Sequence, residues 1–211
     1  MQIYDVTGPI TEGMWSYDSP VSPVRIETIN SIDRPNGWLA HKLELTTLTG
    51  TYLEASAHLI PGGETIAEID PVRFICPVTV LQLPDCPPGY AITRHDLEAT
   101  GIVLSPGQAV LFATGWDRMW NETDYVTSSP FLSADAMEYL VIAGASLVGS
   151  DIPTFDNVLN PAGVNRRLFE ARCLLLAPLV SLRRIPQGKA LTLIALPLRI
   201  ERVCGSPCID I

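Results

Sequence analysis

The sequence predicts a single domain of the α+β class, a mixed α/β arrangement with a β-rich core. Three observations lead to this prediction. The chain has 211 residues, a length typical of one domain, so we expect residues 1–211 to form one unit. Hydrophobic residues make up 47% of the chain, which is enough for a sizeable core. The 18 prolines and 15 glycines predict many turns between short elements, and this favours strands over a helical bundle.

The expected strands are short segments that are apolar or alternating and that end at glycine or proline. Segment 43–48 alternates for most of its length, and segment 109–114 is an apolar run between two glycines. About eight strands are expected, among them 2–6, 43–48, 77–83, 109–114, 147–149, 174–176 and 191–200.

Three helices are expected between these strands, at about 97–100, 134–143 and 161–172. Ser133 suits the N-cap of the second helix, and Gly144 ends it. Pro161 is acceptable in the first turn of the third. By contrast, glycines and prolines recur so often within residues 1–25 that we expect an irregular arm or loop there.

Charge and hydropathy exclude two kinds of partner. The formal net charge of −9 repels phosphate backbones, so we expect no nucleic acid. The most apolar run, 173–182, is interrupted by a proline and is too short to span a bilayer, so we expect no membrane contact. The first residues lack the pattern of a signal peptide, and the default expectation is a cytoplasmic location.

The five cysteines do not predict a disulfide framework, because their number is odd. Cys204 and Cys208 form a C-x3-C pair that could chelate a metal. No second Cys/His pair lies close to them in the sequence, so two free thiols are the preferred interpretation.

The segment 48–58, Leu-Thr-Gly-Thr-Tyr-Leu-Glu-Ala-Ser-Ala-His, carries the strongest functional signal. With its flanks at 5–7, 115–117, 147–151 and 205–207, it resembles the cyclase family that includes the bacterial kynurenine formamidases and isatin hydrolases. That family is recognised by H-x-G-T-H-x-D-x-P-x-H. The chain keeps three motif residues and replaces four: it keeps Gly50, Thr51 and His58, and it has Leu48, Tyr52, Glu54 and Ser56 at the others.

The resemblance runs nearly end to end and implies a swivelling β/β/α fold with a two-metal hydrolytic site. Two further family ligands would fall at Asn165 and Ala177. A catalytic zinc needs about three protein donors. Of these positions, only Glu54 and His58 offer ordinary ligands, so we expect no metal ligand set and no cofactor.

What remains at the motif is an acid–base set. We expect Glu54 to be the base, His58 the acid or its orienting partner, and Tyr52 a hydrogen-bond donor. As substrate-binding residues we expect Thr51, Trp15, Tyr17, Asp151 and Asn165. His41 and His95 are weaker candidates. Each of these residues also has a structural interpretation, as core, cap or surface.

Three functions follow as hypotheses. The first is a metal-independent cyclase that catalyses ring closure or dehydration of a polyketide-like, carbonyl-rich intermediate. The second is a metal-dependent amide or lactam hydrolase of the kynurenine formamidase type, with a rebuilt single-metal site. The third is a non-catalytic binding protein. In each case the expected partner is a small molecule, and we expect a homo-oligomer, either a dimer or a tetramer.

Overall fold

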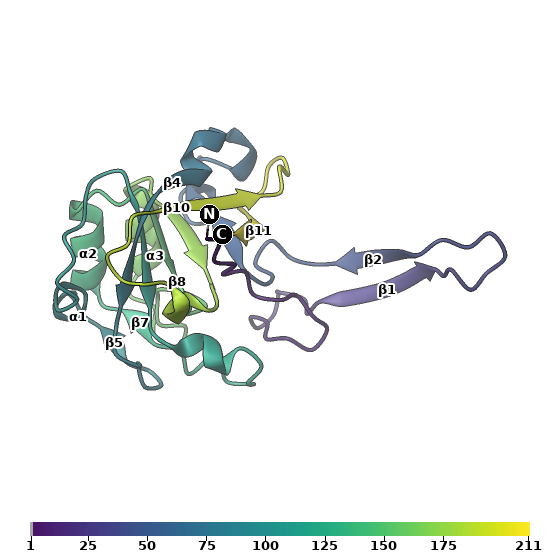
Figure 1. The fold of residues 1–211 in the computed structure, drawn as a ribbon, viewed down its shortest axis with the longest axis horizontal. Helices are drawn as coiled ribbons and strands as arrows, with labels where there is room; N and C mark the ends of the chain where they lie inside the picture. Colours follow the sequence, from purple (N-terminus) through teal and green to yellow (C-terminus); the bar gives the residue numbers. More distant parts are fainter. Residues whose placement is uncertain (1) are drawn as a thin grey trace.

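The computed structural model describes residues 2–211, and its centre is a closed barrel of strands in the order β10-β11-β3-β9-β8-β6-β4 (Figure 1). The barrel strands are β3 (Tyr52–Glu54), β4 (Ile75–Gln82), β6 (Ala109–Ala113), β8 (Leu147–Ser150), β9 (Leu174–Ala177), β10 (Leu191–Pro197) and β11 (Gly205–Asp210). Strands β4, β6, β8 and β9 run parallel, whereas β3, β11 and β10 pair antiparallel.

The three α-helices connect successive parallel strands and lie together along one side of the barrel (Figure 1). They are α1 (Arg94–Glu98), α2 (Ala134–Ile142) and α3 (Val164–Glu170). Such a connection is required because parallel strands cannot be joined by a tight turn. Among the described residues, no helix has both the length and the apolar character needed to cross a membrane.

Alternation along the strands divides the hydrophobic core into two parts. In β6, Leu111 points into the barrel, whereas Phe112 points toward the helices. In β3, Leu53 belongs to the barrel interior, whereas Tyr52 belongs to the layer between barrel and helices. Because side chains alternate along a strand, Glu54 lies on the same face as Tyr52. The motif side chains therefore face the helical layer and not the interior of the barrel.

A long hairpin projects away from the body of the molecule (Figure 1). It consists of β1 (Arg25–Asn30) and β2 (Ala40–Glu44), which pair antiparallel. Residues 2–24 contain no regular strand beyond an isolated bridge at Thr7. A small parallel pair, β5 (Ala91–Ile92) with β7 (Phe131–Leu132), lies beside α1 and α2.

The α+β class, the β-rich core and the three helices are confirmed. Several boundaries differ. The strand expected at 43–48 is β2, which ends at Glu44, and residues 2–6 form no strand. The third helix begins at Val164 because Gly163 has a φ of +81°, a left-handed conformation that a helix cannot include. β1 and β11 were not expected.

Candidate functional site

Glu54 and His58 are brought together by the end of β3 and the turn that follows it. Glu54 is the last residue of β3, and a single turn of 3-10 helix, Ser56–His58, folds the chain back. As a result Nδ1 of His58 lies 3.0 Å from Oε1 of Glu54. The Glu54 side chain is 4% exposed and that of His58 is 29% exposed, so the pair connects the protein interior with solvent.

Cys204 lies beside this pair because of the register between β3 and β11. Gly205 is opposite Glu54, and the backbone N–H of Ala55 donates a hydrogen bond to the carbonyl of Cys204 at 2.8 Å. This register places the Cys204 sulfur 3.5 Å from Nδ1 of His58. The ligand atoms of Glu54, His58 and Cys204 all lie within 4.8 Å of one another.

The electrostatics of this cluster favour a positive charge at its centre. The Cys204 sulfur and the Glu54 carboxylate, both beside Nδ1, raise the pKa of His58 to about 10, although partial burial opposes this. Oε1 of Glu54 is buried without a geometrically satisfied hydrogen bond, and Nδ1 of His58, 3.0 Å away, is its charged neighbour. A buried carboxylate needs a positive partner, which either a protonated His58 or a bound cation can supply.

Helix α3 forms one wall beside His58. The ring of Phe169 lies edge-on to the imidazole, with centroids 6.1 Å apart. Asn165, expected from the sequence as a substrate-binding residue, lies four positions earlier and therefore on the same face of α3. Its Nδ2 donates to Oγ1 of Thr154 at 2.9 Å, and its Oδ1 is buried without a partner.

Tyr52 and Tyr17 form a buried pair of phenols. Their hydroxyl oxygens lie 2.7 Å apart, and both lie within hydrogen-bonding distance of the Pro153 carbonyl, Tyr17 at 2.6 Å and Tyr52 at 3.0 Å. Burial raises the pKa of both phenols, and Glu54 raises it further. Tyr52 therefore stays protonated, and its hydroxyl is engaged within the protein.

Thr51 and Asp151 are engaged in structural hydrogen bonds. The Thr51 hydroxyl donates to the Pro178 carbonyl and accepts from the N–H of Gly8, at 2.6 and 2.8 Å. The buried carboxylate of Asp151 accepts from the N–H and hydroxyl of Thr114 and from the N–H of Gly115. These contacts tie strand ends and loops together around the site.

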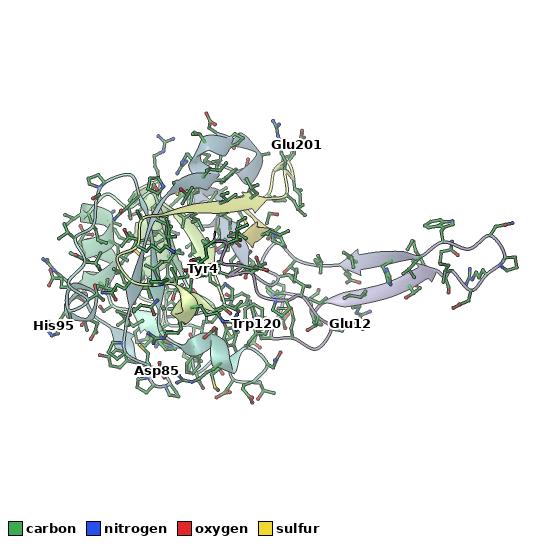
Figure 2. The ribbon with its side chains drawn as sticks, viewed as in Figure 1. Tyr4, Glu12, Asp85, His95, Trp120 and Glu201 are labelled. Atoms are coloured by element: carbon green, nitrogen blue, oxygen red, sulfur yellow. The ribbon has the colours of Figure 1, made fainter. Side chains whose placement is uncertain are left out.

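Trp15 belongs to an aromatic cluster at the base of the N-terminal segment. Its ring contacts Tyr17, Trp120 and Tyr125, with centroid distances between 5.3 and 5.5 Å. Trp120 lies near the junction of the body and the hairpin (Figure 2). Through Tyr17, this cluster is joined to Tyr52 and so to the motif strand.

The two weaker histidine candidates lie away from the cluster. His41 is an exposed residue of β2 on the projecting hairpin. His95 is an exposed residue of α1, on the side of the molecule opposite the hairpin (Figure 2). Neither belongs to the group that Glu54 and His58 form.

The positions of the family's other ligands offer little to a second metal. Ala177 pairs with Tyr52 across β3 and β9, and Leu48 packs against the same hydrophobic layer. Within residues 2–211, Glu54, His58 and Cys204 are the one group of His, Cys, Asp or Glu side chains close enough to hold an ion. The donor set therefore fits one metal ion and not two.

A mostly apolar cavity of about 320 Å³ lies elsewhere, between the N-terminal segment, β4 and β10. Among the described residues, no carboxylate, imidazole or thiol side chain lines it. Because catalysis and metal binding need such groups, we place the candidate site at Glu54 and His58.

The structure has Glu54 and His58 beside each other, and Cys204 and Cys208 are free thiols as expected, but the contact of Cys204 with His58 was not expected. The sequence signal that could have pointed to Cys204 as a site residue was the C-x3-C pair. The structure separates that pair: the Cys208 sulfur is buried and donates to Oδ2 of Asp210 at 3.2 Å, whereas Cys204 contacts His58. The strand at 205–210, which brings Cys204 to the motif, was not expected.

Comparisons with known proteins agree with the resemblance found in the sequence. A model of the family described as "Putative cyclase" matches residues 4–157. An isatin hydrolase of Roseibium aggregatum is 28% identical over 98% of this chain and 89% of its own. A kynurenine formamidase of Bacillus anthracis is 25% identical over 96% of this chain and 93% of its own.

The fold agrees as well. The crystal structure of an isatin hydrolase bound to the product analogue thioisatinate superimposes with a TM-score of 0.85. It is 26% identical and covers 98% of this chain and 90% of its own. The expected cyclase-like fold is thus confirmed.

These comparisons contradict the metal-independent cyclase acting on a polyketide-like intermediate. The named relatives are a hydrolase and a formamidase, and the hydrolase hypothesis fits them better. The geometry gives a physical reason as well. Glu54, His58 and Cys204 place three metal-ligand atoms within 4.8 Å of one another, a group that suits a metal ion better than a metal-free acid–base pair.

Proposed function

The chain belongs to the Putative cyclase family, and from this premise we propose that it is a metal-dependent hydrolase that opens an amide bond, in a lactam or a formamide, of a small aromatic molecule. The isatin hydrolase and kynurenine formamidase relatives support this substrate class. Both match over almost the whole chain, so the similarity includes the elements that surround the site.

One observation carries the metal dependence. Oε1 of Glu54 is buried, accepts no hydrogen bond and lies 3.0 Å from Nδ1 of His58, at two positions of the family's ligand motif. A carboxylate in this state is stabilised when a cation is shared with the neighbouring imidazole. We infer that Glu54 and His58 hold a divalent ion. A metal ion held in this way supplies Lewis acidity, which activates water and polarises a carbonyl.

The remaining residues of the site position the substrate. Phe169 and the aromatic cluster around Trp15 are buried and support the substrate-binding residues from behind. Asn165, with an unpartnered Oδ1 on the same helical face as Phe169, is a candidate acceptor for a substrate N–H. Tyr17 and Tyr52 hold the Pro153 loop in place beside them.

The proposed substrate is thus a small molecule, and the proposed location is the cytoplasm. The direct test is hydrolysis of isatin and of aryl formamides before and after exhaustive chelation. We expect chelation to abolish turnover and added Zn²⁺ to restore it. Turnover that survives complete removal of metal would contradict the proposal, and so would the return of every compound unchanged by the metal-loaded protein.

A further inference from the structure

We propose that Cys204 is the third protein ligand of a single-metal centre, together with Glu54 and His58, and that this centre prefers Zn²⁺ or a similarly thiophilic ion. The inference rests on the proposed function for the role of the metal, but its ligand set is argued from geometry alone. It goes beyond the family motif, which does not include this cysteine.

The distances are of the size found between ligand atoms in a small coordination tetrahedron, and a carboxylate oxygen of Glu54 lies within 4.8 Å of the Cys204 sulfur. Metal–ligand bonds of roughly 2.0–2.3 Å at tetrahedral angles place neighbouring ligand atoms roughly 3.3–3.7 Å apart. Nδ1 of His58 lies 3.0 Å from Oε1 of Glu54 and 3.5 Å from the sulfur of Cys204. A shift of a few tenths of an ångström in the partly exposed imidazole would accommodate an ion.

The backbone holds Cys204 in this position. The β3–β11 register sets Gly205 opposite Glu54, and the Ala55 N–H binds the Cys204 carbonyl. A Cβ at position 205 would lie 3.2 Å from Cγ of Glu54 and 3.0 Å from the Leu53 carbonyl oxygen. Glycine at 205 thus leaves room for the Glu54 side chain beside the thiol. The loop that carries Cys204 follows β10 and passes Glu201, labelled at its end in Figure 2.

The same contacts argue against a nucleophilic cysteine relay. In such a relay the thiol and the carboxylate contact different nitrogens of the histidine. Here the Cys204 sulfur and Oε1 of Glu54 both approach Nδ1. Three donor atoms within 4.8 Å of one another are close enough to share one metal ion. A carboxylate, an imidazole and a thiolate leave a fourth position for water, as in catalytic zinc sites.

The sulfur ligand also predicts the choice of metal. Thiolates favour Zn²⁺ and related ions, whereas Mg²⁺, Ca²⁺ and Mn²⁺ favour all-oxygen sites. We therefore expect Zn²⁺ to bind far more tightly than Mn²⁺. Loss of the sulfur should narrow this difference.

The test uses the full-length protein stripped of metal and reloaded with Co²⁺, whose absorption reports its ligands. We expect a thiolate-to-cobalt charge-transfer band in the wild-type protein. Cys204→Ser should lose the band and bind Zn²⁺ on the order of 100-fold more weakly. The control Cys76→Ser, at a cysteine outside the cluster, should keep both.

A cobalt-loaded wild-type protein without the thiolate band would overturn the inference, and so would a band that persists in Cys204→Ser. Absence of the band from the wild-type protein overturns the inference without any variant, so a misfolded variant does not prevent the test. If hydrolysis requires metal but the thiolate band is missing, the proposed function stands and the role of Cys204 fails. If the band is present but hydrolysis survives chelation, the ligand set stands and the proposed function fails.

Discussion

Oε1 of Glu54 lies 3.0 Å from Nδ1 of His58, yet it accepts no hydrogen bond. A buried carboxylate oxygen beside a partly exposed imidazole can accept a cation that enters from solvent.

Glu54→Gln and His58→Ala should each lower hydrolysis by about 100-fold or more, because each removes one ligand of the inferred ion. Both variants should purify with less metal, measured by elemental mass spectrometry. Suitable controls are Glu201→Gln and His95→Ala, both exposed and outside the cluster. Wild-type rates and metal content in the two site variants would exclude this site.

Tyr52→Phe should affect stability more than chemistry. The Tyr52 hydroxyl is engaged with Tyr17 and the Pro153 carbonyl, so its loss should cost about 1 kcal/mol in unfolding free energy. Tyr17 still donates to Pro153, so the loop should stay in place and kcat should fall far less than in Glu54→Gln. Urea unfolding and steady-state kinetics measure the two effects. A loss of kcat as large as that of Glu54→Gln would show that the Tyr52 phenol acts on the substrate directly.

Asp210 should make the protein less stable as the pH rises. Burial raises the pKa of its carboxyl from 3.8 to about 7, although the Cys208 thiol lowers it, and Oδ1 has no hydrogen-bond partner. Between these two pKa values the folded state binds more protons than the unfolded state, so stability falls as the pH rises from about 4 to about 7.

The measurement is urea unfolding at pH 5 and pH 8. Asp210→Asn should reduce the difference between the two pH values by an amount on the order of a few kcal/mol, as expected from the shift in pKa. Asp33→Asn, at an exposed position in the hairpin turn, should leave the difference unchanged. An unchanged pH dependence in Asp210→Asn would contradict the assignment.

The hairpin formed by β1 and β2 should take part in self-association. A two-stranded sheet is marginally stable by itself, and this one exposes Trp38 by 62% and Leu39 by 61% near its tip. We expect the wild-type chain to elute as a dimer or tetramer in size-exclusion chromatography with light scattering. Trp38→Ser with Leu39→Ser should shift it toward the mass of one chain, whereas Val103→Ser, also exposed, should not. A wild-type mass equal to one chain would refute self-association.

Much of the fold could be predicted because its signals are local. The apolar run of β6 between Gly107 and Gly115 and the helix after Ser133 were found where expected. β11 was missed because Gly205, Pro207 and Asp210 do not favour a strand, and only pairing with β3 and β10 makes it one. β1 was missed although Ile26 and Thr28 alternate with charged residues and a Pro-Asn-Gly turn signal follows at 35–37. Most of its residues are exposed, so no buried face marks it.

The sequence by itself determined the family, the class of fold and the closeness of Glu54 to His58. This closeness is a local property, because one turn of chain after a strand brings residues four positions apart together. The tertiary structure decided the rest. Cys204 lies 146 positions from His58 and reaches it through the register of two antiparallel strands. The alternation of β3 directs Tyr52 and Glu54 toward the helices while Leu53 fills the barrel. The register of the strands and the side of the sheet on which each side chain lies depend on the closure of the whole barrel, and no local pattern specifies them.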